Sequence, residues 1–349
     1  MILVTGATGH IGNVLIRELI ARGKQVRALV LPGEPCDSLS GLPIEMVVGD
    51  ILDPDTLDRW MKDVKLVYHL AGIVSILPGD EEFMYRVNVE GSRNVARAAL
   101  KARVKRMVHT ASVHAFRREP HGVTMDERTP LSPAGTAGAY DRTKAEGVQA
   151  VLEVVNEGLD AVIVCPSGVI GPHDYFGSEM GELVKTFATG KMNFIVNGAY
   201  DFVDVRDVAR GMILAAEKGR AGEKYILSGE QVSLRWLLNK TQQIAGWRSP
   251  TVLIPYNVAL FFSRYTHYFY RHLKKTPQFT PYSLKTVVEN SRFSRAKAEK
   301  ELGYYPRPLE ESIRDYLAWR AEYYQKCYDK KAGKAKSRTW KAGKAENPG

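Results

Sequence analysis

Residues 1–12 read MILVTGATGHIG: a short apolar run ends in a turn with three glycines, and a helical pattern follows at once. In a strand, glycine-rich turn and helix of this kind, backbone N–H groups and the positive end of the helix dipole can meet a pyrophosphate. Gly6, Gly9 and Gly12 leave space for that ligand and for close packing of the helix on the strand. An ordinary tight turn is the alternative, but the strand before the turn and the helix after it favour a dinucleotide site.

The composition is typical of a globular protein that can bury a large core, with 349 residues, 44% hydrophobic and 25% charged. Met1 leads straight into the first strand without a basic leader. Cys36, Cys165 and Cys327 lie far apart and show neither a disulfide framework nor metal-ligand spacing. We therefore expect a cytoplasmic protein without a metal.

The formal net charge is +10, and residues 326–349 contribute +6 of it through eight basic and two acidic side chains. This segment is rich in Gly and Ala, which predicts a disordered, solvated tail rather than an arm for nucleic acid or an anionic membrane. The aromatic stretch Val252–Tyr270 is too interrupted by polar residues and Pro255 to span a bilayer. We interpret it as core or pocket lining, with an interfacial membrane helix as the less favoured alternative.

Strand and helix patterns alternate up to residue 228, which predicts βαβ units and a parallel sheet. Helical patterns separated by prolines dominate beyond it. The strands expected in the first part are Ile2–Val4, Gln25–Leu31, Ile44–Val48, Leu66–Leu70, Arg106–Thr110, Ala161–Cys165 and Lys224–Leu227. The helices expected along the chain are Ile11–Ala21, one opening at Asp53-Pro54, Glu81–Ala102, Ala139–Asn156, Val205–Glu217, Leu234–Ala245, Val258–Leu273, Arg295–Leu302 and Leu309–Tyr324.

The pattern predicts an α/β fold, a Rossmann-type doubly wound parallel sheet over residues 1–228 that binds NAD(P). Residues 166–200 are expected to reach toward the substrate side. A smaller, mainly helical C-terminal substrate lobe is expected over residues 229–325, followed by the tail, 326–349.

A second pattern is Tyr140-Asp141-Arg142-Thr143-Lys144 within a helical stretch. Residues four apart share a helix face, and an ammonium group beside a phenol lowers the phenol's pKa from about 10. Ser112 follows the fifth expected strand at the carboxyl edge of the sheet, where its hydroxyl could donate to a substrate carbonyl. Each feature alone is also typical of a surface helix or a turn, but the combination is far more specific.

On these residues the chain resembles the extended short-chain dehydrogenases/reductases, within the NAD-dependent epimerase/dehydratase group and most like its dihydroflavonol reductase-like branch. The resemblance covers roughly residues 1–320. Further segments that carry it are Val48-Gly49-Asp50, His69-Leu70-Ala71-Gly72, Val87-Asn88-Val89-Glu90-Gly91, the run from Pro166 to Pro172 and the run from Phe202 to Ala209. Four polar residues in or near these segments are interpreted as structural: His69, His114, Asp204 and Asp207.

The resemblance implies that Tyr140 is the general acid that protonates a carbonyl oxygen during hydride transfer. Lys144 would lower the pKa of Tyr140 and bind the nicotinamide ribose, Ser112 would polarise the carbonyl, and Asn88 would anchor a water relay to Lys144. The implied cofactor-binding residues are Gly6, Thr8, Gly9, His10, Ile11, Gly12, Asp50, Ile51, Leu70, Ala71, Gly72, Tyr140, Lys144, Pro166, Gly168 and Val169. A homodimer through Glu81–Ala102 and Ala139–Asn156 is also implied.

NAD and NADP are distinguished near the end of the second strand, where an acidic side chain binds the ribose 2′-hydroxyl and a basic one accepts a 2′-phosphate. The tip Val30-Leu31-Pro32-Gly33 carries neither charge, and Glu34 lies past the turn. Because nothing acidic is placed there to repel the phosphate, we expect a slight preference for NADP over NAD.

The function expected from these features is hydride transfer between NAD(P) and a carbonyl or alcohol of a fairly apolar small molecule. A nucleotide-sugar epimerase is an alternative, because epimerisation begins with the same oxidation. A non-catalytic nucleotide-binding regulator is a second alternative, against which the intact Ser112, Tyr140 and Lys144 argue. A sugar dehydratase is disfavoured, because Val113-His114 follows Ser112 where such relatives have Asp-Glu.

Overall fold

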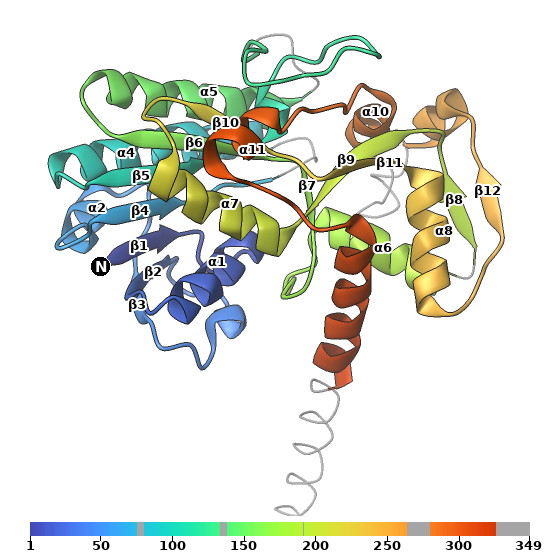
Figure 1. The fold of residues 1–349 in the computed structure, drawn as a ribbon, viewed down its shortest axis with the longest axis horizontal. Helices are drawn as coiled ribbons and strands as arrows, with labels where there is room; N and C mark the ends of the chain where they lie inside the picture. Colours follow the sequence, from blue (N-terminus) through green and yellow to red (C-terminus); the bar gives the residue numbers. More distant parts are fainter. Residues whose placement is uncertain (75–79, 133–137, 191, 264–279, 326–349) are drawn as a thin grey trace, which may run out of the picture.

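The computed structural model describes residues 1–74, 80–132, 138–190, 192–263 and 280–325. Its main sheet has seven parallel strands in the order β10-β6-β5-β4-β1-β2-β3 (Figure 1). The strands are β1 Ile2–Thr5, β2 Val26–Val30, β3 Glu45–Val48, β4 Leu66–His69, β5 Arg106–Thr110, β6 Ala161–Pro166 and β10 Lys224–Leu227. The strand order reverses between β1 and β4, which is where open α/β sheets bind ligands, at the carboxyl ends of the strands. The Rossmann-type fold expected from the sequence is confirmed.

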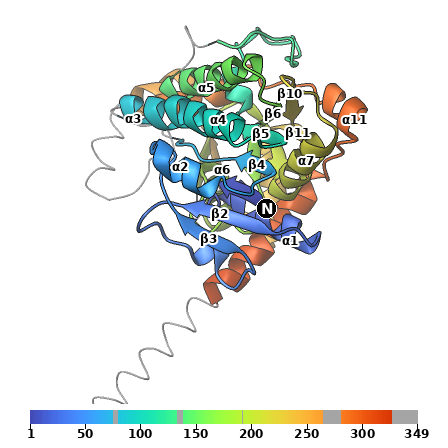
Figure 2. The same cartoon turned by 90° about the vertical axis from the view of Figure 1, so that its left-hand side faces the viewer.

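Helices cover both faces of this sheet (Figure 2). One face packs on α1 His10–Ala21, α7 Val205–Lys218 and α11 Ala296–Leu302; the other packs on α2 Pro54–Trp60, α4 Ser92–Lys101 and α5 Ala139–Asn156. Successive strand residues face opposite sides, so Val4 and Tyr68 join the first core whereas Leu3 and Val67 join the second. Near-continuous apolar strands are therefore required, as in other parallel sheets buried on both faces.

Local sequence signals explain where most of these elements begin and end. Asp53 caps α2 by accepting from the N–H of Asp55, and Pro54 occupies the first helical position. Gly23, with φ +68°, follows the end of α1. The expected bounds of β5, α5, β10 and α8 match the structure.

The expected continuous helix Glu81–Ala102 is wrong in its middle. It comprises α3 Glu81–Tyr85, a π-helical turn Arg86–Gly91 and α4. The backbone carbonyl of Asn88 in this turn lies against α5 so closely that a Cβ at Gly147 would come within 2.5 Å of its oxygen. Such π turns occur mostly at functional sites, and no periodic pattern of apolar residues predicts them.

The smaller lobe contains two small sheets that the sequence analysis did not predict. The strands are β7 Gly168–Ile170, β8 Asn193–Ile195, β9 Ala199–Asp204, β11 Glu230–Ser233 and β12 Thr251–Leu253, arranged as β11-β9-β7 and β12-β8. The helices are α6 Glu179–Thr189, α8 Leu234–Ala245, α10 Pro281–Val288 and helical residues 309–325. These strands are only three to six residues long, and their distant partners leave no local alternation to detect. Ile170, Phe187, Phe202, Leu237 and Ile313 form one core across them.

Two sequence predictions fall wholly or partly outside the described residues. The tail 326–349 lies outside them, as does the part of Val252–Tyr270 that follows residue 263. In the described part, Leu253, Phe261 and Phe262 are 49%, 56% and 62% exposed, so the interpretation of these side chains as core is wrong. Among the described helices, none combines the length and the apolar character that crossing a bilayer requires.

An ionic cluster joins the C-terminal segment to the Rossmann part. The guanidinium of Arg307 donates to both carboxylate oxygens of Asp207, at 3.0 Å each, and the Arg307 N–H adds a bond of 2.8 Å. Asp204 caps α7 through the N–H of Arg206, whose guanidinium also pairs with Asp315 at 2.7 Å. Asp204 and Asp207 thus have the structural contacts expected of them.

Arg307→Ala removes the guanidinium that hydrogen-bonds the buried carboxylate of Asp207 and leaves it the more distant Arg210, at 3.9 Å. We expect the free energy of unfolding in urea to fall by about 2 kcal/mol. Arg314→Ala is the matched control, because Arg314 pairs with Glu310 at the surface and its loss should change little. If both substitutions lowered the free energy of unfolding equally, the Arg307–Asp207 contact would not stabilise the fold as we expect.

Candidate active site

The glycine turn packs directly on the backbone that follows β4. Gly6 has φ +65°, and a Cβ there would lie 2.6 Å from the Ala71 nitrogen and the Leu70 carbonyl carbon. A Cβ at Gly12 would lie 2.1 Å from the Gly6 oxygen. Only glycine permits both approaches, which place Gly6 against Leu70 and Ala71 and Gly12 against Gly6.

The N-terminus of α1 suits an anion. Its N-cap residue, Gly9, makes no side-chain cap bond, and the first turn holds no acidic residue. The helix therefore presents N–H groups and a positive dipole end to the carboxyl edge of the sheet. His10 contacts the Pro172 carbonyl through Nε2 at 3.0 Å, and Ile11 packs on the core below. These residues fit the pyrophosphate of a dinucleotide.

Glu34 lies at the tip of β2, against the sequence-based expectation. Its carboxylate accepts a hydrogen bond from the Thr8 hydroxyl and one of 2.9 Å from the Leu31 N–H. Thr8 itself is buried in the glycine turn. The assumption that no acidic side chain lies there is therefore wrong, because the turn after β2 folds Glu34 back onto the glycine turn.

The other predicted cofactor residues follow strands at the same edge. Asp50, whose Oδ1 accepts from the Leu52 N–H at 2.9 Å, and buried Ile51 lie just beyond β3, and Gly72 lies beyond β4. Pro166 ends β6. Gly168 and Val169 lie in β7, where a Cβ at Gly168 would touch the Tyr200 ring at 2.8 Å.

Ser112, Tyr140 and Lys144 converge next to this edge. Buried Ser112 caps the 3-10 turn Val113–Ala115, and its hydroxyl is close enough to Tyr140 to lower the pKa of that phenol. Lys144 lies one turn further along α5, with Nζ 6.0 Å from the centre of the Tyr140 ring. The same Nζ donates to the Thr110 carbonyl at 3.4 Å. The structure thus brings the three expected polar groups together.

Asn88 connects the π-helical turn to this set. Its Oδ1 accepts from the Ile73 N–H at 2.8 Å, and its Nδ2 donates to the Ile73 carbonyl and to the Thr143 hydroxyl. A Cβ at Gly72 would lie 3.0 Å from Asn88 Oδ1 and 3.2 Å from Lys144 Nζ. Asn88 and Lys144 therefore face the same small space, while the water relay stays a prediction.

Burial is the main influence on the pKa values of Tyr140 and Lys144, and the expected lowering of the Tyr140 pKa by Lys144 stays a prediction. Burial raises the pKa of Tyr140 above its ordinary value, the charges of Asp141 and Glu179 raise it further, and the hydrogen bond from Ser112 opposes them. Burial also lowers the pKa of Lys144 to about 8. Tyr140 is consequently protonated at neutral pH.

The two histidines differ in their surroundings. His69 lies between the hydroxyls of Thr5 and Ser92, at 2.7 and 3.0 Å, which fits its structural interpretation. His114, for which the sequence offered no partner, contacts Asp141 and two tyrosines, and its ring centre lies 5.5 Å from that of Tyr140. The sequence signals that were passed over are its position two residues after Ser112, and that of Asp141 directly after Tyr140.

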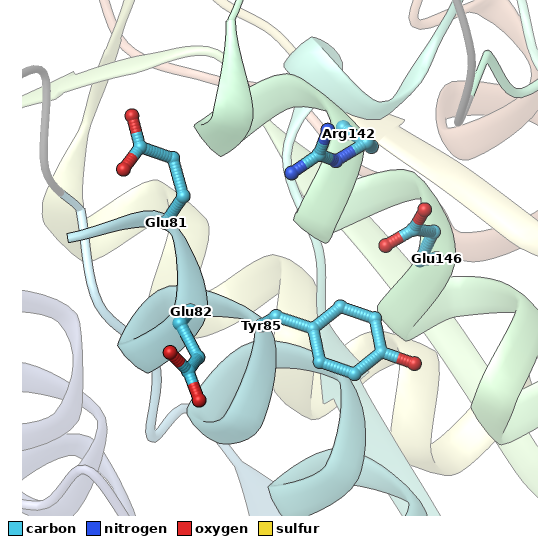
Figure 3. Close-up of a pocket in the computed structure, with 5 residues that line it drawn as sticks. All are labelled: Glu81, Glu82, Tyr85, Arg142 and Glu146. Carbon is cyan, nitrogen blue, oxygen red and sulfur yellow. The ribbon is translucent and has the colours of Figure 1, made fainter. Parts of the chain in front are cut away.

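A separate open hollow of about 340 Å³ lies between α3 and α5 (Figure 3). Arg142 follows Tyr140 by two residues and so points to the other side of α5. The residues that line the hollow are Glu81, Glu82, Tyr85, Arg142 and Glu146. Despite these carboxylates, the described parts of the chain contain no cluster of three or more residues suited to hold a metal ion.

Comparison with known proteins decides the family. The model of the NAD dependent epimerase/dehydratase family matches residues 2–228, which include the glycine turn, Ser112, Tyr140 and Lys144. The chain belongs to this family. It is therefore an NAD(P)-dependent enzyme of the extended short-chain dehydrogenase/reductase type, and the resemblance stated from the sequence is confirmed.

Two family members are similar over nearly their whole length. The chain is 35% identical over 321 residues to sterol demethylase protein B of Methylococcus capsulatus, covering 91% of this chain and 97% of that protein. It is 34% identical over 320 residues to a Synechocystis protein that bears the name of a dihydroflavonol 4-reductase, covering 90% and 93%.

Solved structures show the same family fold. The crystal structure of gox2253 has a TM-score of 0.82 at 37% identity, over 93% of this chain and 98% of that one. The UDP-glucuronic acid 4-epimerase from Bacillus cereus, solved in complex with NAD, has a TM-score of 0.73 at 19% identity, over 93% and 99%. At that identity the second likeness shows the fold alone.

Gly6→Ala should destabilise the fold by more than the strain of a positive φ alone, because the new Cβ overlaps the backbone after β4. Gly23→Ala is the matched control: Gly23 has φ +68° but nothing within 4 Å of the added Cβ. We expect Gly23→Ala to lower the free energy of unfolding by about 1 kcal/mol and to leave NADH binding unchanged. Gly6→Ala should lower it further and abolish the fluorescence change of bound NADH. Equal behaviour of the two variants would contradict the fit of the glycine turn.

Proposed function

We propose that this enzyme transfers hydride between NAD(P) and a carbonyl or alcohol of a fairly apolar small molecule. The observation that carries the proposal is the convergence of Ser112, Tyr140 and Lys144 at the sheet edge beside the glycine turn. The names of the two similar family members refer to a sterol and a dihydroflavonol, both largely apolar ring systems, which supports a substrate of this class.

The dinucleotide would be held by the glycine turn, the N-terminus of α1 and Lys144, and its nicotinamide would supply or accept the hydride. Ser112 would donate a hydrogen bond to the carbonyl oxygen and hold it beside Tyr140. Tyr140, protonated at neutral pH, would then give its proton to that oxygen as negative charge develops there. Ser112 is buried and Tyr140 is partly buried, so each interaction is stronger than it would be in open solvent.

Glu34 leads us to propose NAD rather than NADP as the preferred cofactor. A carboxylate at the tip of β2 can accept from the ribose 2′-hydroxyl, and it repels a 2′-phosphate. The hydrogen bonds from Thr8 and Leu31 hold it next to the glycine turn. The expectation of NADP rested on the absence of such a group.

We also infer a homodimer and a cytoplasmic location, in keeping with the family resemblance and with the free thiols of Cys36 and Cys165. The helices expected at the dimer contact are unlike an apolar interface, since neither α4 nor α5 has an exposed large hydrophobic side chain. Surface pairs such as Arg93 with Glu153, at 3.1 Å, join the two helices instead. A dimer contact through α4 and α5 would therefore be mainly polar. The exposed side chains of Phe83 and Tyr85 in α3 would supply its apolar surface.

Tyr140→Phe should lower kcat at least ~100-fold, because it removes the proton donor. NADH oxidation is measured with a 3-oxosteroid and a dihydroflavonol, and UDP-glucose turnover without net oxidation tests the epimerase alternative. Tyr85→Phe is the matched control at the surface and should leave kcat unchanged. NADH affinity should be the same in the wild-type protein and in Tyr85→Phe. Full turnover by Tyr140→Phe would contradict the role of this residue, and NADH binding without turnover of any probe would favour the regulator.

Glu34→Gln should narrow the difference between the Kd values of NADH and NADPH. We expect the wild-type protein to bind NADH at least about tenfold more tightly, equivalent to roughly 1.4 kcal/mol. Asp37→Asn removes the same charge from an exposed position on the same turn and should leave the ratio unchanged. Tighter binding of NADPH by the wild-type protein would refute the assignment.

A further inference from the structure

A buried carboxylate lies directly beside the predicted general acid. Asp141 follows Tyr140 in the first turn of α5, and it is only 2% exposed. His114 Nδ1 lies 2.9 Å from Asp141 Oδ1, and the hydroxyl of Tyr282 donates to the same oxygen. No step of the proposed reaction uses these contacts, although isolated carboxylates are rarely buried without a role or a partner.

The partners of Asp141 come from both parts of the molecule. His114 follows β5, whereas Tyr282 belongs to α10 of the smaller lobe. The Tyr282 ring also packs on Gly138, where a Cβ would lie 2.9 Å from it. His114 Nε2 lies 2.7 Å from the hydroxyl of Tyr200 in β9. The smaller lobe therefore closes over the carboxylate that adjoins Tyr140.

The contacts keep Asp141 ionised. Burial alone would raise the pKa of Asp141, but the hydrogen bonds from His114 and Tyr282 and the nearby charge of Arg118 hold it below its usual value. Burial and Arg118 lower the pKa of His114, so its ring is neutral at neutral pH. The guanidinium of Arg118 shares this site, with Nη2 2.8 Å from His114 Nδ1, but of the two charges it is Asp141 that raises the pKa of Tyr140.

Several other ionisable groups lie near Tyr140 and Asp141 and also affect the pKa values of these two residues. The titratable and charged groups that face Tyr140 and Asp141 are Lys144 from α5, Ser112, His114 and Arg118 after β5, Glu179 from α6, Tyr200 from β9, and Tyr282 and Glu289 from α10.

We propose that Asp141, held by His114 and Tyr282, is a positioning residue that keeps Tyr140 protonated and fixes its place beside Ser112. A negative charge near a phenol in a poorly solvated site disfavours the phenolate. Carbonyl reduction needs the phenol and alcohol oxidation needs the phenolate. Asp141 thus favours proton donation and makes oxidation depend on alkaline pH. This inference rests on the proposed role of Tyr140.

The test reads the protonation state of Tyr140 without a substrate. The full-length protein is labelled with tyrosine carrying 13C at Cζ, and the Tyr140 signal is assigned from its loss in Tyr140→Phe. We expect Asp141→Asn to lower the midpoint of the Tyr140 titration by about one pH unit. Asp141→Glu keeps the charge and should restore the wild-type behaviour.

Two control variants separate charge from packing. Asp160→Asn removes a carboxylate that pairs with Arg106 at the opposite edge of the sheet, at 2.8 Å, and should leave the Tyr140 signal unchanged. Tyr282→Phe removes a donor from Asp141 but leaves its charge, so the Tyr140 midpoint should not fall. Circular dichroism establishes that each variant is folded.

The outcomes distinguish this inference from the proposed function. A downward shift in Asp141→Asn, reversed in Asp141→Glu, supports it, and the pH profile of alcohol oxidation should move the same way. An unchanged Tyr140 signal in folded Asp141→Asn overturns the inference while leaving the proposed function intact. If Asp141→Asn is unfolded, Asp141→Ala is read in the same way: a fall in the Tyr140 midpoint supports the inference, and an unchanged midpoint overturns it. Full activity of Tyr140→Phe would instead contradict the proposed function.

Discussion

The close contact between the glycine turn and the backbone after β4 sets the geometry of the whole site. Because Gly6 can approach Leu70 and Ala71 without a side chain, the next residue, Gly72, lies where Asn88 and Lys144 meet. Asn88 then ties the π-helical turn to α5 through Thr143. A short series of contacts thus connects α5, which carries Tyr140, to the glycine that follows β1, two strands away from β5.

The smaller lobe completes the site from the opposite side. Tyr282 and Tyr200 come from elements that follow the predicted catalytic residues in the chain, and both reach His114. Tyr282 also donates to Asp141, the residue that follows Tyr140, so in our proposal one carboxylate links the packing of the smaller lobe to the proton affinity of Tyr140. Burial would raise the pKa of the phenol even without this charge.

Local patterns predicted the Rossmann part well because its signals are local. Apolar strand runs, the Asp53-Pro54 helix start and the Tyr140 to Lys144 spacing each lie within a few residues. Contacts between distant segments were not predicted. Nothing near Glu34 indicates that its carboxylate returns to Thr8, and nothing near Tyr282 indicates a partner about 140 residues earlier, at Asp141. The short strands of the smaller lobe were not predicted for the same reason, since each pairs with a segment distant in the sequence.

The central claim is that Ser112, Tyr140 and Lys144 surround the reactive end of a dinucleotide bound at the glycine turn. A crystal structure of the protein with NADH tests it most directly. We expect the pyrophosphate over the N-terminus of α1 and the nicotinamide ribose in contact with Lys144, with the ring beside Tyr140. A nucleotide bound elsewhere, or a nicotinamide remote from Tyr140 in the filled site, would contradict the claim.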